Sequence, residues 1–258
     1  MKRPERRNRK IGTKSSGFKH RNDMTIPERF LDQFGNNTRY YERAKADRVY
    51  QFKIGTQIIT ILYENPRLGH SYGCTPYDVE HLMRLLPGED IEGIELVSFR
   101  QPTHKQSQQF PVWGRLIYYS TIGSYEGTCI NLEAINLDHV IEWPRKLSVE
   151  NQAELARLKS DGHLYEETSR THRFTVTENS LRHHILYRTL LHEIGHWVDY
   201  DSKIYREDHM IDNDCGVAYD LYFSRPSVEL ESFAHRYAKE KADLLRAAQK
   251  IPFTKIAF

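Results

Sequence analysis

The sequence has little cysteine and no long hydrophobic run. Cys74, Cys129 and Cys215 lie far apart, and none of them forms a CxxC pair. An odd, scattered set of three argues against a disulfide framework. It predicts the reduced thiols of a cytoplasmic protein and removes cysteine from the candidate metal ligands. No apolar stretch approaches the roughly 20 residues that span a bilayer, so we expect no membrane association.

An apolar stretch is also missing behind the basic N-terminus, so no secretory signal peptide is expected. Residues 1–22 are rich in Lys and Arg and poor in apolar side chains, which predicts a disordered tail. Such a tail either keeps the protein soluble or, through residues 2–21, contacts nucleic acid or another acidic surface. We expect a cytoplasmic protein, and secretion by a route without a signal peptide stays open.

Beyond the tail, the chain has the composition of a globular protein. Hydrophobic residues make up 39% of it and charged residues 28%, which is typical of a soluble protein with a core of its own. Residues 49–65 are β-branched and aromatic and predict a long strand or a hairpin. A capped helical pattern follows at residues 75–86. Residues 91–100, 113–120 and 127–136 then predict three strands, the last two as an antiparallel pair.

The C-terminal half has helical patterning. Residues 144–171 are polar and predict an insertion with a short helix. Residues 177–201 predict a long helix that Thr177 or Ser180 would cap, with a broad apolar stripe along one side. A last helix is expected near residues 226–250.

This order of elements predicts an α+β fold, with a small sheet of about 3–5 strands packed on the long helix and the C-terminal helix. The expected domains are a disordered basic tail, an N-terminal extension with a strand or hairpin, and a main domain that carries the insertion. Their predicted ranges are residues 1–22, 23–74 and 75–258, with the insertion at 144–171.

The segment LLHEIGHWVDY (residues 190–200) carries the strongest chemical signal. His192 and His196 are four residues apart, so a helix places both imidazoles on one face, where they can reach one zinc ion. Glu193 points about 100° further round the helix and can accept a proton from a water molecule at the metal. Composition alone yields such a motif in roughly one chain in twenty. Its apolar surroundings and Gly195 in mid-helix, which suggests a close backbone approach, favour a real site.

A catalytic zinc needs a third protein ligand. The extension HxxGxxH is absent, because Asp199 and Ser202 stand at its Gly and His positions. One set of alternatives is the acidic side chains of the polar loop that follows the motif. These are Asp201, Asp208, Asp212 and Asp214.

The last predicted helix offers a better third ligand. Glu231 shares its face with Ala234 and Ala238, whose small side chains would let this helix approach the His192 helix closely. Glu229 projects elsewhere. We therefore prefer Glu231 over Glu229 and over the loop aspartates.

The segments HEIGHWVD and ESFAHRYA resemble the gluzincin metallopeptidases. They are most similar to the compact type found in the anthrax lethal factor catalytic domain and the Pro-Pro endopeptidases, with HExGHxxD followed by ExFAxxF/YA. The resemblance implies a zincin-like fold, zinc bound by His192, His196 and Glu231, and Glu193 as the general base. It also implies that Asp199 supports a ligand or packs the helices.

The chain departs from these relatives where they carry an oxyanion-stabilising tyrosine, because Ser224 occupies that position. Tyr222 and Tyr219 are the candidate replacements. Tyr205 and His209 are further alternatives. A phenol near the developing negative charge would suit this role.

His235, four residues after Glu231, has two interpretations. It braces the Glu231 carboxylate from behind, or it is an ordinary histidine of the surface or core.

The residues predict a zinc-dependent endopeptidase that acts on a protein or peptide substrate. We expect the substrate to pair with an exposed sheet edge, for which residues 127–136 are the candidate strand. Two alternatives remain. One is a non-catalytic zincin-fold protein that binds nucleic acid or a regulatory partner through its basic tail, and the other is a secreted toxin-like protease.

Overall fold

The computed structural model divides the chain into two compact units, residues Met1–Arg43 and Ala44–Phe258. It describes all residues except 1–28, 32–36, 43–44, 110, 138–139 and 207–214. In the smaller unit, β1 (Arg29–Leu31) pairs antiparallel with β2 (Asn37–Arg39), and a 3-10 turn follows. The predicted basic tail lies outside the described residues.

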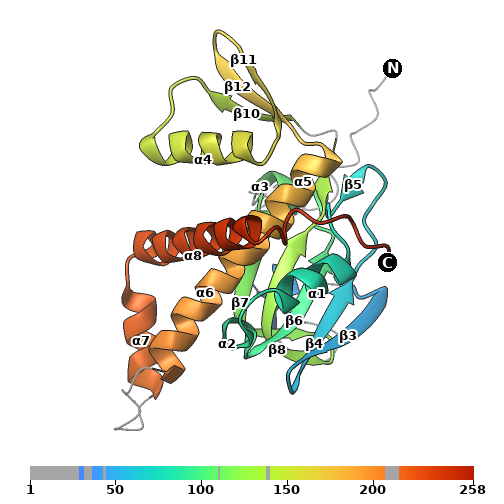
Figure 1. The fold of residues 1–258 in the computed structure, drawn as a ribbon, viewed down its shortest axis with the longest axis vertical. Coiled ribbons are helices and arrows are strands. Elements are labelled where there is room, and N and C mark those ends of the chain that lie inside the picture. Colours follow the sequence, from blue (N-terminus) through green and yellow to red (C-terminus); the bar gives the residue numbers. More distant parts are fainter. Residues whose placement is uncertain (1–28, 32–36, 43–44, 110, 138–139, 207–214) are drawn as a thin grey trace, which may run out of the picture. The chain divides into compact units, whose positions relative to one another are not determined.

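The larger unit is an α+β structure around a five-stranded mixed sheet (Figure 1). The strands, in spatial order, are β3 (Arg48–Ile54), β4 (Gln57–Tyr63), β6 (Ile94–Arg100), β8 (Tyr125–Glu133) and β7 (Gly114–Ile122). The central pairs β4–β6 and β6–β8 are parallel, whereas the outer pairs β3–β4 and β8–β7 are antiparallel. The predicted α+β class and strand number are confirmed.

The predicted hairpin at residues 49–65 forms as β3 and β4. It is part of the main sheet, since β4 pairs with β6, and it does not belong to a separate extension at residues 23–74. The division between the two units falls at Arg43 instead of residue 74.

The prediction of the exposed edge was wrong. Strand β8 pairs with β6 on one side and β7 on the other, so residues 127–136 contain an internal strand. Its polar Asn131 and Glu133 are buried, and Glu133 forms an ion pair of 2.8 Å with buried Arg100. Among the described strands, β7 and β3 lie at the two ends of the sheet.

The predicted helix at residues 177–201 forms as one continuous helical stretch with a π-helical insertion. It comprises α5 (Glu178–His184), the π-helical η4 (Ile185–Leu190), α6 (Leu191–Asp201) and a second π-helical segment, η5 (Ser202–Arg206). Thr177 is the N-cap and forms a capping box with Ser180. π-Helical turns inside α-helices occur frequently at functional sites.

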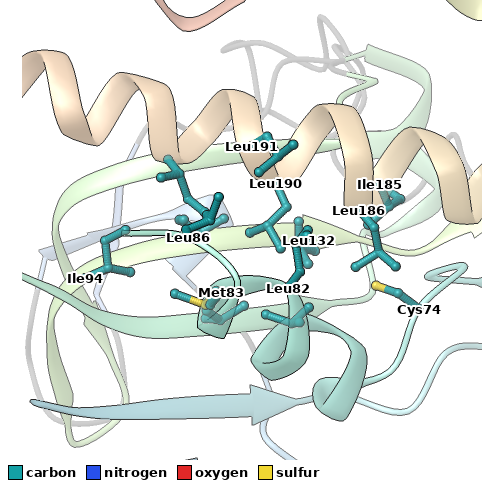
Figure 2. Packing of buried hydrophobic residues seen from close by; sticks show 14 of the residues in the cluster. Cys74, Leu82, Met83, Leu86, Ile94, Leu132, Ile185, Leu186, Leu190 and Leu191 are labelled. Atoms are coloured by element: carbon teal, nitrogen blue, oxygen red, sulfur yellow. The ribbon is translucent and has the colours of Figure 1, made fainter. Parts of the chain in front are cut away.

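Apolar side chains fasten this helix to the sheet. Figure 2 shows Leu186 and Leu190 of the long helix converging with Leu132 of β8 and Leu82 of α1 (Pro76–Arg84). All four are fully buried. A buried leucine contributes about 1.5–3 kcal/mol relative to an exposed one, so this contact holds the helix against the sheet.

Helix α8 (Ser227–Ala247) crosses α6 (Figure 1). The predicted helix at residues 226–250 is therefore confirmed. Helix α7 (Cys215–Ser224) precedes it and was not predicted. The remaining short elements of the larger unit are α2 (Gly88–Ile91), α3 (His104–Gln109), β5 (His70–Ser71) and β9 (Ile135–Asn136).

The predicted insertion forms a small subdomain. Its three antiparallel strands have the order β10 (Val140–Pro144), β12 (Thr171–Thr175), β11 (Leu164–Glu167). Helix α4 (Val149–Ser160) is the predicted short helix, and Ser148 caps it by accepting from the Asn151 amide. Across the described residues, none of the helices has the length and apolar character needed to cross a membrane.

Candidate metal centre

Helices α6 and α8 bring three potential metal ligands together. The Nε2 atoms of His192 and His196 lie 3.1 Å apart, because residues four apart share a helix face. From α8, Glu231 places Oε2 3.2 Å from His192 Nε2 and Oε1 3.6 Å from His196 Nε2. The structure thus assembles the His192, His196 and Glu231 set preferred from the sequence.

These separations fit a single zinc ion. Tetrahedral ligands at 2.0–2.1 Å from zinc lie about 3.3 Å from one another, and the three observed distances are close to that value. Two nitrogens and one carboxylate oxygen are also a ligand set that catalytic zinc takes. The residues present therefore fit the metal that the motif implies.

Glu193 lies beside this triad and is buried. Its Oε2 accepts a hydrogen bond of 2.7 Å from the backbone amide of Leu116 in β7, which orients the carboxylate. Burial raises the pKa of Glu193 above its ordinary value, although the neighbouring His192 and His196 act in the opposite direction. A carboxylate with a raised pKa is a better proton acceptor near neutral pH.

The charges of the triad are complementary. Hydrogen bonds to His192 and then to His196 lower the pKa of Glu231 far below its ordinary value, so the carboxylate is ionised. Burial alone would lower the pKa of His196, but its bond to Glu231 raises the pKa overall. Without a metal, the carboxylate thus attracts protons to this cluster, and a divalent cation would replace them.

Gly195 allows the two helices to approach closely. A Cβ atom at this position would lie 3.0 Å from Ala234 Cα, 3.1 Å from the Ala234 carbonyl oxygen and 3.1 Å from Tyr237 Cβ. A side chain at Gly195 would therefore have to displace the backbone of α8 at Ala234. This confirms the close approach that Gly195 and the small Ala234 suggested in the sequence.

Replacing Gly195 by Val is expected to force α8 away from α6. Overpacking of this kind costs about 1–3 kcal/mol, and the displacement moves Glu231, which precedes Ala234 on α8. We expect a lower free energy of unfolding in urea and a weaker affinity for zinc. Gly88→Val is the control, because nothing lies within 4 Å of a Cβ at Gly88. Unchanged zinc affinity in Gly195→Val would contradict this explanation of the glycine.

Asp199 supports the helix packing. It is buried, and its Oδ2 accepts from Tyr222 Oη at 3.2 Å and from Arg225 Nη1 at 2.8 Å. These bonds connect α6 to α7 and to the start of α8. Of the two implied roles, Asp199 thus has the contacts of a helix-packing acid, and among the described residues it does not hydrogen-bond to His196.

The candidate tyrosines lie away from the triad. Tyr222 is buried with its hydroxyl directed at Asp199, and Tyr219 is half exposed and packs on Phe223. Neither lines the pocket of about 530 Å³ that contains His192, His196 and Glu231, and neither does Ser224 or Tyr205.

Two of the less favoured ligand alternatives also lie elsewhere. Glu229 is exposed and faces Arg225 at 3.6 Å, and Asp201 pairs with Arg206. The other ligand alternatives, the aspartates at 208, 212 and 214, are outside the described residues, as is His209, the further alternative for stabilising the oxyanion.

The sequence analysis missed Tyr118, which lines the pocket from β7. Its hydroxyl is 3.5 Å from that of Tyr222, at the limit of a hydrogen bond. Burial raises the pKa of Tyr118 to about 12, so the phenol keeps its proton. Strand alternation places Gly114, Leu116 and Tyr118 on one face of β7, and this signal would have identified Tyr118 had β7 been recognised as the end strand.

His235 packs its ring against His192, with 4.4 Å between the ring centroids. One of its ring nitrogens lies within 4.8 Å of the ligand atoms of His192 and Glu231. Burial, followed by the charge of His192, lowers the pKa of His235 to about 4, so the ring is neutral. The described residues show this packing on His192 but no hydrogen bond from His235 to Glu231, so the brace on that carboxylate stays a prediction.

The description of this cluster rests on the geometry of the chain itself, because comparison with known proteins identified no relative. The chain matches no family model, no curated protein and no solved structure.

Proposed function

We propose that this protein is a zinc-dependent endopeptidase, with His192, His196 and Glu231 as the metal ligands and Glu193 as the general base. The observation that carries the proposal is the convergence of two imidazoles on one carboxylate. The Nε2 atoms of His192 and His196 lie 3.1 Å apart, and they lie 3.2 Å and 3.6 Å from Oε2 and Oε1 of Glu231, respectively. The buried Glu193 lies next to them. A structural zinc site needs no such carboxylate, whereas hydrolysis does.

The residues of the chain divide the chemistry between them. A zinc ion held by the three ligands would supply a Lewis acid for the scissile carbonyl and lower the pKa of a water molecule. Glu193 has one carboxylate oxygen fixed by the Leu116 amide, and the other is the candidate acceptor for the proton of the attacking water. Glu193 would then donate this proton to the leaving amine.

The end strand β7 is the proposed platform for the substrate. It pairs with β8 on one side, and Gly114, Leu116 and Tyr118 line the pocket. An extended peptide that pairs with a strand edge gains main-chain hydrogen bonds independent of its side chains. We therefore infer that a peptide binds along β7. Residues 127–136, which the sequence suggested as the exposed edge, contain an internal strand.

Tyr118 is the proposed oxyanion donor. Tyr118→Phe removes only the hydroxyl and is expected to lower kcat by about 10- to 1,000-fold with little change in zinc content. Tyr222→Phe is the control, because that hydroxyl is committed to Asp199. If Tyr222→Phe lowers kcat and Tyr118→Phe does not, the roles of the two phenols are reversed.

Zinc content and peptide cleavage test the proposal as a whole. The purified full chain should contain zinc at the triad and cleave members of an unstructured peptide library, with loss of cleavage on chelation and recovery with zinc. His196→Gln should lose that zinc ion. A chain that binds zinc through the triad but cleaves no peptide would instead favour the non-catalytic alternative.

A further inference from the structure

A second cluster of potential ligands lies where the insertion meets the long helix. Asp161 and His163 follow α4, and His184 is the last residue of α5. Gly162 between the first two has a φ of +84°, a conformation that favours glycine. This tight turn lets both flanking side chains reach His184.

The ligand atoms of these three residues lie within 4.8 Å of one another. Asp161 Oδ2 is 2.9 Å from His184 Nδ1, and His163 Nε2 is 3.4 Å from the same nitrogen. Such separations are typical of ligands around one zinc ion, which lie about 3.3 Å apart. Two imidazoles and one carboxylate are again a zinc ligand set.

The cluster is incompletely satisfied by hydrogen bonds. His163 and His184 are 4% and 1% exposed, yet His163 Nδ1 has no hydrogen-bond partner among the described residues. Asp161 Oδ2 is also buried and, despite its close contacts, lacks a bond of acceptable geometry. Buried polar atoms without a hydrogen bond call for an explanation, and an ion bound among them is one.

An aromatic side chain closes one side of the cluster. Trp113 covers His184 at 3.9 Å between ring centroids. The ring would shield a bound ion from solvent on that side.

Arg188, one turn further along the helix, braces the cluster. Its Nη1 lies 3.0 Å from Asp161 Oδ2, and its Nη2 contacts both Glu154 and His184 Nε2. Because a guanidinium only donates, its bond to His184 Nε2 requires that nitrogen to accept, which places the ring proton on Nδ1 in the metal-free protein. A cation on Nδ1 would move this proton to Nε2 and end that bond, and Arg188 would keep the two carboxylates as partners. Hydrogen-bonded partners behind the ligands are a general feature of metal sites.

We propose that Asp161, His163 and His184 bind a second divalent metal ion, zinc by its ligand set, which fastens the insertion to the long helix at the wall of the pocket. His184 precedes His192 by eight residues, and six residues of this stretch are π-helical, with a smaller rise than the 1.5 Å of an α-helix, so the two histidines lie on the order of 10 Å apart along the helix axis. Metal ions that share a reaction lie about 3.5–4 Å apart, so the second ion has a structural role. This inference does not depend on the proposed peptidase activity.

Metal counting on the full chain tests the second site. After loading with zinc and removal of the excess, the wild type should retain two zinc ions per chain by mass spectrometry. His163→Gln and the near-isosteric Asp161→Asn should each retain one, as should His196→Gln, and the combination of His163→Gln with His196→Gln should retain none. Circular dichroism would verify that each variant is folded.

His172→Gln is the matched control, because His172 is also a buried histidine of the insertion but hydrogen-bonds to Tyr165 and the Arg145 carbonyl oxygen. It should retain both ions. The second site is excluded if the wild type retains at most one ion that His196→Gln removes. It is equally excluded if folded His163→Gln and Asp161→Asn retain as much zinc as the wild type. Loss from His163→Gln with no effect of His196→Gln would keep the second site and refute the catalytic one.

Discussion

Glu193→Gln is expected to lower kcat/KM for peptide hydrolysis by about 100- to 10,000-fold, the range contributed by general acid–base catalysis. The amide keeps the size of the carboxylate but cannot accept the proton of the attacking water. Its carbonyl oxygen can still accept from the Leu116 amide, so the fold should be unchanged. Cleavage rates on one peptide, measured with the zinc content of each sample, check this result.

Glu229→Gln is the matched control for this variant. It removes a carboxylate from α8 close to Glu231, but Glu229 is exposed and lies outside the pocket. Its activity should equal that of the wild type. Full activity of zinc-loaded Glu193→Gln would remove Glu193 from the mechanism, whereas loss of both activity and zinc would assign it to the metal site.

The largest effect on stability is expected for Asp78→Ala. Asp78 is fully buried and accepts from Arg182 at 2.5 and 3.0 Å and from the backbone amides of Thr75 and Ile256, both at 2.9 Å. Its removal leaves the Arg182 charge buried without its main partner, which costs about 3–5 kcal/mol. Urea unfolding measures this loss. Asp243→Ala is the control, since its exposed pair with Lys239 contributes about 0.3–0.5 kcal/mol.

The Asp78 contribution should also depend on pH. Burial acts to raise the pKa of Asp78, but the bonds from Arg182 and the amides of Ile256 and Thr75 outweigh it and lower the pKa overall. The stabilisation is therefore present above the unfolded-state pKa of about 4 and lost as the pH falls through the lower folded-state value. The unfolding free energy of Asp78→Ala should decline less than that of the wild type on acidification. Parallel pH profiles would show that Asp78 is not responsible.

The parts of the site that depend on helical spacing were predictable from the sequence. His192 and His196 share a face because they are one turn apart, and the small residues Gly195 and Ala234 indicated where α8 approaches. Each of these signals depends on the spacing of residues within one helix, so it can be recognised without knowledge of the tertiary structure. Their convergence on Glu231 required only that the two helices touch.

The order of the strands was not predictable in this way. The sequence pattern of β8 suggested a solvated polar face, yet Asn131 and Glu133 are buried and Glu133 is compensated by Arg100 of the neighbouring strand. That compensation involves residues 33 positions apart and leaves no local periodicity. For the same reason Tyr118 was overlooked. Helix α7 was missed because its apolar residues do not gather on one side, so it lacks the pattern that identifies an amphipathic helix.

The π-helical segment η4 lies between the two proposed ion sites, so a change in its length bears on how the two sites are oriented relative to each other. A π-helical bulge contains one residue more than the α-helix it interrupts. The wider π turn takes up this extra residue, so the helix before it and α6 after it keep nearly the faces that an uninterrupted α-helix would give them. A homologue that lacks one residue of Ile185–Leu190 should therefore keep both the HEIGH centre and the anchor of the insertion. By contrast, one residue lost from the α-helical Leu191–Asp201 would turn the helix on one side of the deletion by about 100° relative to the other side.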